Sequence, residues 1–462
     1  MYYHQNMIGW LCSVFVILAS IFQNINGDTL KMSNILYRHG ARSPTRFYPT
    51  NPNQVTAWPD GAGRLSQVGM NMEYHLGKFL KERYVDTKFI NQSYLHKEVS
   101  IRSSSVDRCL QSAQAQLAGL YPPSGWQIWG NEELGKLWQP IPVQTVPGDE
   151  DPLLRPEDTD CPRIGEIWSS MTKASTYIQK AKDNKELLDY MTKNSGKNIT
   201  LSNILFDVTD DLLCERAEGL KSAQWAIDRF PDILELTYWA FNYLYQGSDE
   251  LGRLLGGALL GKMVGNMKTM ASGDTDDSLS KLNIFSGHDT SILSFTTALN
   301  TKFPVPEFAA CILVELYETP TGDHYVTINY RNGFGNITLT PMNLTGCDVY
   351  QCPLDDFVRI TSKRIPTNRH KECNPVEPFF TKKNLTVIAA VLLATTIFLF
   401  FLFIWMLVRS RYRKTYIRSS LKKKAQQDSE DNEKNKRRHE RGDESENKAI
   451  NDTEDENAAL IV

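Results

Sequence analysis

Two arginines flank a histidine near the start of the chain, where residues 38–44 read Arg-His-Gly-Ala-Arg-Ser-Pro. The guanidinium groups of Arg38 and Arg42 can each bind two oxygens of a phosphoryl group. The imidazole of His39, held between them, can accept that group on a ring nitrogen and carry it covalently. Taken alone, the stretch could equally be a basic turn after a strand. The rest of the chain decides between these two interpretations.

Two later segments carry groups suited to the same chemistry. Residues 102–108 contain Arg102 and Arg108, and a His-Asp pair stands at His288 and Asp289. Guanidinium groups would neutralise phosphoryl charge, and an aspartic acid can give a proton to a leaving group. Each segment also has a structural alternative: the arginines could be exposed cations at a helix end, and Asp289 could cap a helix N-terminus. The capping role is compatible with catalysis.

The elements predicted around these segments place both histidine motifs at one edge of a sheet. Apolar patterns predict strands at 30–37, 99–102, 282–285, 310–317 and 325–331, and helices at 65–84, at 252–270, up to residue 120 and from about residue 290. Two of these strands run into Arg38 and towards His288 respectively. In open α/β sheets, ligands bind beyond the carboxyl ends of the strands. We therefore expect one shared site.

A helical stretch interrupts this pattern of strands and helices. Residues 151–249 read as mostly helical and separate two regions in which strands and helices alternate. This order predicts an α/β sheet that carries an inserted, mostly α-helical cap. We place the α/β core at about 28–145 and 250–375, and the cap at about 146–249.

The two ends of the chain predict a single-pass membrane protein. An apolar run at 8–22 indicates a signal peptide over 1–27, although its flank lacks Lys and Arg and an uncleaved anchor is the alternative. The uncharged run 387–408 is long enough to span a bilayer as a helix. Basic residues follow it directly and mark the cytoplasmic side. Residues 28–386 would then be lumenal or extracellular, and the polar tail 409–462 would be disordered.

Short motifs agree with this topology. Asn91, Asn198, Asn336 and Asn343 each begin an Asn-x-Ser/Thr triplet in the lumenal part and are predicted glycosylation sites. The basic stretch 409–424 is expected to touch anionic lipid headgroups. Residues 456–461 are similar to an acidic dileucine signal, which would bind a sorting adaptor, although an accidental apolar terminus explains them equally well. The sequence thus predicts a type I protein of lysosomes, endosomes or the cell surface.

Cysteine usage fits an oxidising compartment. Cys12 would leave with the signal peptide, and the other seven cysteines all precede the predicted span. Six of the seven can pair, and spacing alone does not fix the pairing. Cys347 and Cys352 could close a short loop, and one thiol remains unpaired.

Taken together, the histidine and arginine motifs resemble those of the histidine acid phosphatases, in the branch of the lysosomal and prostatic enzymes. Similar stretches also occur at 65–69, 138–143, 213–215 and 330–332, so that the resemblance covers about residues 30–375. It implies a histidine-phosphatase (phosphoglycerate mutase-like) α/β sandwich with an inserted helical cap. It also implies a homodimer, which no feature of the sequence itself indicates.

The resemblance assigns a role to each group. His39 would be the nucleophile that forms a phosphohistidine, and Asp289 the general acid that protonates the leaving oxygen. The phosphoryl oxygens would be bound by Arg38, Arg42, Arg102 and His288. Flanking cations disfavour the charged form of an imidazole, so part of His39 would stay neutral and nucleophilic even in acid.

The resemblance also implies the disulfides Cys161–Cys373, Cys214–Cys311 and Cys347–Cys352. Cys109 stands where the family usually has threonine and is then the unpaired thiol. Residues 256–262 read Gly-x-x-x-x-Gly-Lys, but a helical pattern surrounds them and methionine follows where a P-loop needs Ser or Thr. We expect neither a metal nor an organic cofactor.

The predicted function is acid hydrolysis of small phosphate monoesters. Two alternatives stay open: a phosphatase directed at lysophospholipids or nucleotides, and a membrane receptor built on an inactive phosphatase domain. The formal net charge of −3 is too small to indicate a polyanionic partner, and no nucleic acid is expected.

Overall fold

The structure is a computed structural model that describes residues 27–130, 133–273, 279–301, 305–335, 338–375 and 382–439. Contacts divide the chain into two compact units, Met1–Pro375 and Val376–Val462. The predicted signal peptide lies outside the described residues except for Gly27, and so does Asn336. Asn91, Asn198 and Asn343 are exposed.

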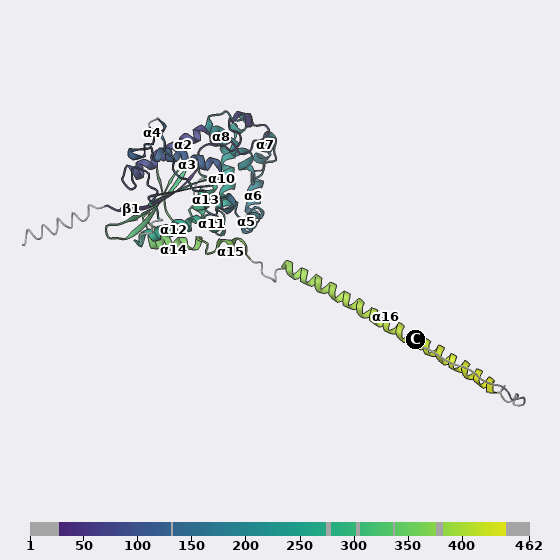
Figure 1. Cartoon of the computed structure of the whole chain (residues 1–462). Helices are drawn as coiled ribbons and strands as arrows, with labels where there is room; N and C mark the ends of the chain where they lie inside the picture. Colours follow the sequence, from purple (N-terminus) through teal and green to yellow (C-terminus); the bar gives the residue numbers. More distant parts are fainter. Residues whose placement is uncertain are drawn as a thin grey trace, which may run out of the picture. The chain divides into compact units, whose positions relative to one another are not determined.

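A mixed sheet forms the centre of the first unit (Figure 1). Its strands are β1 (Thr29–Arg38), β2 (Val99–Ser103), β3 (Leu282–Gly287), β4 (Cys311–Glu318), β5 (His324–Arg331), β6 (Thr340–Met342) and β7 (Cys352–Pro353). The order is β2-β3-β1-β4-β5-β6, and β7 also pairs with β5. Strands β1, β2 and β3 are parallel, whereas β4 and β5 run antiparallel to their neighbours. All five predicted strands are present.

The register of the parallel strands brings the predicted motifs together. Arg38 at the end of β1 pairs with Gly287 at the end of β3, and Ser103 at the end of β2 pairs with Ser286. The backbone N–H of His39 donates to the carbonyl of Gly287 at 3.1 Å. The carboxyl ends of three strands therefore meet at one edge, as the sequence predicts.

The described α-helices of the first unit cover both faces of the sheet and build the insertion, and α16 belongs to the second unit. They are α2 (Gln67–Leu80), α3 (Asp107–Leu120), α4 (Leu134–Leu137), α5 (Pro162–Lys173), α6 (Ser175–Asp183), α7 (Lys185–Ser195), α8 (Asp210–Glu218), α9 (Gln224–Asp228), α10 (Phe230–Gln246), α11 (Asp249–Leu255), α12 (Gly257–Ala271), α13 (Asp289–Ala298), α14 (Leu354–Thr361), α15 (Arg369–Cys373) and α16 (Lys382–His439). Two π-helical turns, Lys81–Val85 and Leu205–Thr209, extend α2 and precede α8.

Alternation along β1 assigns its side chains to two separate cores. Ile35 and Tyr37 pack with residues of α2 and α3, whereas Leu36 packs with residues of α12, α13 and α14. Neighbouring side chains of a strand point to opposite faces of the sheet. Both faces of β1 are covered, so its side chains are buried on both, including the polar Ser33 and Asn34. Figure 1 shows α2 and α3 on one side of the sheet and α12 and α14 on the other.

The predicted insertion is helical from α5 to α10. Residues 146–249 are described throughout and contain no strand. Helices α7, α8 and α10 share a separate apolar cluster that includes Leu188, Leu212 and Leu236, and Tyr48 from the core enters the same cluster. Because contacts join this region and the sheet into one compact unit, the boundaries at about 146 and 249 stay predictions.

One predicted helix is divided in the structure. The pattern at 252–270 predicts a single helix, but α11 ends at Leu255 and α12 begins at Gly257. Gly256 lies against α13 so closely that an added Cβ would approach the carbonyl oxygen of Ser294 to 2.0 Å. This close packing of α13 explains why a glycine stands between the two helices.

The cysteine prediction is correct for two pairs and wrong for the third. Cys161–Cys373 and Cys347–Cys352 are bonded, whereas Cys214 and Cys311 are free and buried, as is Cys109. The Cys214 thiol accepts a hydrogen bond from Arg42 at 3.5 Å and packs in a cluster beside the histidine motif. The Cys311 side chain instead lies in the core between the sheet and α2 and α3. The two thiols occupy separate packing environments, so no bond forms.

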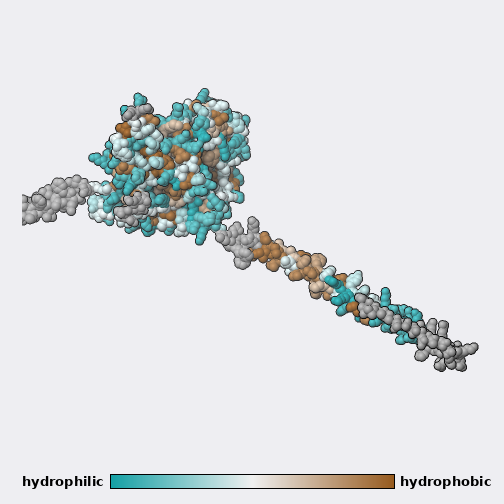
Figure 2. All heavy atoms as spheres, viewed as in Figure 1, coloured by the Kyte–Doolittle hydropathy of each residue, from teal (hydrophilic) through white to brown (hydrophobic). Residues whose placement is uncertain are grey.

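The second unit contains one long helix, α16. Among the described residues, α16 is the helix that is apolar and long enough to cross a membrane. The mean hydropathy of its apolar window is 2.9. In Figure 2 its first part is brown and its later part turns teal, which matches the change of composition after residue 408. The disorder predicted for 409–462 is wrong over 409–439, which stay helical. Residues 382–439 lack Pro and Gly and are rich in Lys and Arg after the apolar run, which favours helix. The predicted sorting signal lies outside the described residues.

Candidate active site

His39 is buried at the end of β1 with one ring nitrogen free of a proton. Its Nδ1 lies 2.9 Å from the carbonyl oxygen of Gly40, and a carbonyl only accepts, so Nδ1 carries the hydrogen. The Nε–H of Arg108 donates to Nε2 of His39 at 3.1 Å. Nε2 therefore presents its lone pair to the arginine. The ring is in the tautomer that a nucleophilic histidine needs.

Glycine is required next to this histidine. An added Cβ on Gly40 would lie 2.2 Å from the carbonyl oxygen of Gly69, which belongs to the first turn of α2. The backbone N–H of Gly40 also donates to the hydroxyl of Ser112 in α3 at 3.2 Å. These contacts fix the turn that follows β1 and hence the carbonyl that orients His39.

Arg38 lies beside His39 and joins the predicted acid to the site. Its Nη2 pairs with Oδ2 of Asp289 at 2.9 Å, and its Nη1 donates to the carbonyl of Pro306 at 2.7 Å. The guanidinium carbon lies 4.1 Å from the ring centre of Phe308. Asp289 begins α13 and also accepts the backbone N–H of Thr290 at 2.8 Å. Its side chain is 21% exposed, so a leaving group can reach it.

Arg42 is held by a carboxylate that the sequence analysis missed. Asp210, the first residue of α8, binds the two terminal nitrogens of Arg42 through its two oxygens, both at 2.9 Å. Both side chains are almost fully buried. Burial alone would raise the pKa of Asp210, but Arg42 outweighs it and lowers that pKa. Breaking such a buried pair by removing one partner costs about 3–5 kcal/mol.

The structure places Arg108, and not the predicted phosphate ligand Arg102, beside the two histidines. Arg102 points to Asp151, whose fully buried carboxylate it binds at 2.8 Å. Alternation along β2 explains this, because Val99, Ile101 and Ser103 are buried while Arg102 faces the other way. Arg108 belongs to the first turn of α3 and reaches both histidines. Arg102 and Arg108 lie six positions apart in the sequence, and the direction of the side chains along β2 decides which of them reaches the histidines.

His288 is the second buried imidazole of the site. Its ring centre lies 5.5 Å from that of His39 in an edge-to-face arrangement. Its Nδ1 lies 3.5 Å from Nη2 of Arg108, and its Nε2 lies 3.0 Å from the hydroxyl of Ser104 and 3.3 Å from Nη1 of Arg155. The Cys109 thiol is 3.4 Å from the same Nε2. Burial raises the pKa of that thiol to about 12, so it remains protonated.

The electrostatics keep both imidazoles uncharged. Burial, followed by the charges of Arg108 and Arg42, lowers the pKa of His39 well below its usual range. Burial, Arg108 and Arg155 do the same for His288. Among the described residues, Arg108 is the guanidinium group of this cluster that has no carboxylate partner. The Nε groups of Arg38 and Arg42 are buried without a partner in the same part of the chain. The cluster is therefore suited to an incoming anion.

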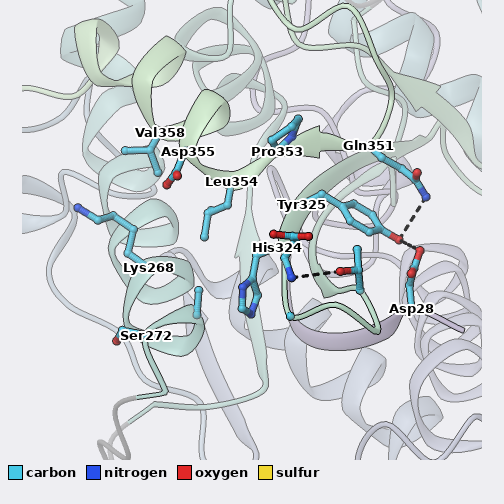
Figure 3. Close-up of a pocket in the computed structure, with 14 residues that line it drawn as sticks. Asp28, Lys268, Ser272, His324, Tyr325, Gln351, Pro353, Leu354, Asp355 and Val358 are labelled. Carbon is cyan, nitrogen blue, oxygen red and sulfur yellow. Dashed lines mark hydrogen bonds between the residues drawn. The ribbon is translucent and has the colours of Figure 1, made fainter. Parts of the chain in front are cut away.

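Of two hollows in the first unit, one lies beside this cluster and the other lies far from it. A cavity of about 240 Å³ is lined by Arg38, Tyr238 and Phe308, and Phe308 lies 6.0 Å from the ring of His39. The larger groove of about 890 Å³ (Figure 3) is lined by Asp28 and His324, which precede β1 and begin β5. His39 lies at the other end of β1. The larger groove thus lies at the end of β1 opposite to His39. Among the described residues, no three His, Cys, Asp or Glu side chains are grouped to hold a metal.

The fold and these groups define a class of phosphoryl-transfer proteins with a nucleophilic histidine. The family described as the histidine phosphatase superfamily (branch 2) matches residues 29–331. The chain belongs to this family.

Individual relatives agree with that family. Lysosomal acid phosphatase of Rattus norvegicus is 37% identical over 354 residues, which covers 76% of this chain and 81% of that protein. Prostatic acid phosphatase of Homo sapiens is 36% identical over 365 residues, covering 78% and 92% respectively. The phytase of Citrobacter braakii has a TM-score of 0.57 at 18% identity, over 75% of this chain and all of that one, and shares the fold.

The position of Arg108 leads to a prediction about pH. Protonation of His39 blocks the nucleophile, so activity falls as the pH drops through the pKa of this ring. Arg108→Gln removes a charge that lowers that pKa, and the acidic limb of the kcat/KM profile should move to higher pH. Loss of a phosphoryl contact should also reduce kcat/KM about 100-fold. Profiles with p-nitrophenyl phosphate measure both effects.

Arg163→Gln is the matched control for this measurement, because Arg163 pairs with Glu166 and Glu250 on the surface. An acidic limb that stays in place in Arg108→Gln, or moves to lower pH, would contradict this account of His39.

Proposed function

We propose that this protein is an acid phosphatase that hydrolyses phosphate monoesters through a phosphohistidine on His39. The observation that carries the proposal is the unprotonated Nε2 of a buried histidine, directed at Arg108, which lacks a carboxylate partner among the described residues. The relatives named lysosomal and prostatic acid phosphatase support it. An inactive receptor would need no such arrangement of nucleophile, cations and acid.

In the first step, the phosphoryl group binds against Arg38, Arg42 and Arg108. The Nε2 lone pair of His39 attacks phosphorus, a P–N bond forms, and the P–O bond to the leaving alcohol breaks. The electron pair of the broken bond stays on oxygen, which takes a proton from the carboxylic acid of Asp289. Positioned cations stabilise the charge on the phosphoryl oxygens as the bond order changes.

In the second step, water attacks the phosphohistidine. The Asp289 carboxylate, left ionised by the first step, accepts a proton from that water while the P–N bond breaks. Inorganic phosphate leaves, and His39 and Asp289 return to their starting forms. Arg38 pairs with Asp289 at 2.9 Å, which places the proposed acid beside the proposed phosphoryl site. The first step uses Asp289 with its proton, and the second step uses it without.

We also propose that the first unit is a lumenal or extracellular domain, that α16 anchors it, and that residues 409–439 lie in the cytoplasm. The protein would then belong to the lysosomal or endosomal system or to the cell surface. The two disulfides, three exposed glycosylation triplets and the basic flank after residue 408 support this topology. The homodimer and the sorting adaptor stay predictions. Exposed apolar side chains cluster near α4, where a partner could bury them: Trp126, Ile128, Trp129, Leu134 and Leu137.

The covalent intermediate is the first test of this function. Purified full-length protein in detergent, mixed briefly with ³²P-labelled p-nitrophenyl phosphate and quenched in alkaline detergent, should carry label on the peptide that contains His39. Alkali is needed because the P–N bond of phosphohistidine breaks in acid. His39→Ala should carry none and lose activity by at least about 1,000-fold. Turnover without label on this peptide would refute the mechanism.

The role of Asp289 is tested through the leaving group. Phenol has a pKa of about 10, as tyrosine does, and needs more help from an acid than the more acidic nitrophenol. Asp289→Asn should therefore reduce kcat/KM for phenyl phosphate about tenfold more than for p-nitrophenyl phosphate. Equal losses for the two substrates would remove Asp289 from the role of general acid.

The topology is tested by its glycans. Enzymatic removal of N-glycans should lower the apparent mass of the protein made in animal cells. A variant with Gln at Asn91, Asn198 and Asn343 should lose most of that difference. A protein without glycans, whose sheet domain is digested by protease outside sealed microsomes, would contradict a lumenal domain.

A further inference from the structure

A fourth guanidinium group lies at the site, and the mechanism above does not use it. Arg155 places Nη1 3.3 Å from Nε2 of His288, on the opposite ring nitrogen from Arg108. Arg108 also reaches His39, whereas no contact between Arg155 and His39 is present in the described structure. Arg155 therefore lies one side chain further from the reacting phosphorus than the three arginines that bind the phosphoryl group.

The segment that carries Arg155 is fixed at both ends. Asp151 binds Arg102 and accepts the backbone N–H groups of Leu153 and Leu154 at 3.1 and 3.2 Å. The loop between Asp151 and Cys161 continues into the disulfide with Cys373. Arg102, which the sequence analysis expected to bind phosphate, thus anchors the loop that presents Arg155.

Further contacts hold the middle of this loop against the site. Glu157 accepts the hydroxyl of Thr290 at 3.0 Å, directly after the proposed acid. Arg369 donates to the carbonyl of Pro156 at 2.9 Å. A side chain on a loop fixed in this way loses little freedom when it binds a ligand, which is the condition for a preorganised contact.

Two carboxylates of its own loop, Glu157 and Asp158, act on the charge of Arg155, and only Asp158 binds the guanidinium group directly. Asp158 binds its Nε at 2.8 Å and also contacts Nη2, but the Asp158 side chain is 40% exposed, against 7% for the Asp210 that holds Arg42. Water weakens an exposed pair far more than a buried one. The Nη1 group faces neutral His288 and no carboxylate. Arg155, itself 20% exposed, can thus bind an anion at the mouth of the site.

We propose that Arg155 forms a second anion subsite, which binds a carboxylate or phosphate group carried by the leaving alcohol and selects doubly charged substrates. The inference rests on the proposed phosphatase function and names its substrate class. Arg38, Arg42 and Arg108 supply the charge that the transferred phosphoryl group needs. Arg155 lies farther from the phosphorus than these three arginines. The anion that it can bind is therefore a charged group on the leaving alcohol of the substrate.

The test compares substrates that differ in one charge. In the carboxylate arm, 3- and 4-carboxyphenyl phosphate are compared with the neutral carbamoylphenyl phosphates of the same shape. In the phosphate arm, benzene-1,4-diyl bisphosphate is compared with 4-hydroxyphenyl phosphate. The readout is the ratio of kcat/KM within each pair, measured on full-length protein in detergent. Using ratios cancels most effects on folding and on the shared chemical step.

Arg155→Gln should lower at least one of these ratios about five- to tenfold, because it removes one charged contact to the substrate. Arg155→Lys keeps the charge and should recover part of the ratio. Arg229→Gln is the matched control, since Arg229 pairs with Asp232 on the surface of the cap and should leave both ratios as in the wild type. Added salt should reduce the wild-type ratio and leave that of Arg155→Gln nearly constant.

The outcomes separate this inference from the function on which it rests. Loss of one ratio identifies the anion, carboxylate or phosphate, and loss of both shows that charge alone is recognised. Equal losses for charged and neutral members of a pair, or unchanged ratios, would overturn the subsite. A wild-type protein that hydrolyses none of these esters would instead refute the proposed phosphatase function.

Discussion

Two uncharged imidazole rings inside a cluster of guanidinium groups are the constraint on which the site depends. A protonated His39 next to Arg108 would bring like charges together in a buried place, where their repulsion is much stronger than in water. Neutrality of the ring is therefore enforced by its surroundings at acidic pH as well. The same surroundings leave the cluster short of negative charge, and a phosphate ester supplies it.

Most of the carboxylates that pair with the arginines of this cluster come from the inserted region. Asp151, Asp158 and Asp210 each bind one arginine of the cluster, and all three lie between residues 146 and 249. The α/β core thus carries His39, Arg38, Arg42 and Arg108, while the inserted region carries Arg155 and the carboxylates that bind Arg42, Arg102 and Arg155. A change in the insertion can alter charge at the site without touching the parallel strands that position His39.

The sequence predicted those parts that depend on local pattern and failed where long-range geometry decides. Apolar runs that end in Arg38 and near His288 were sufficient to predict that His39 and Asp289 lie at one edge of the sheet, because parallel strands share that edge. The choice between Arg102 and Arg108 required the register of β2, which composition does not reveal. Asp210 and Arg155 gave no local signal, since each meets its partner across more than a hundred residues. The pairing of Cys214 with Cys311 came from the resemblance alone, and in this chain the two free thiols pack in different clusters.

The disulfide between Cys161 and Cys373 has a consequence for the durability of the molecule. It joins the beginning of the helical insertion to the last helix of the domain and encloses 212 residues of separation along the chain. A protease that cuts once inside this loop leaves two pieces that are still covalently joined. The piece with the nucleophile then remains attached to the piece with the acid and to α16. In a compartment rich in proteases, a nicked molecule could persist as one particle.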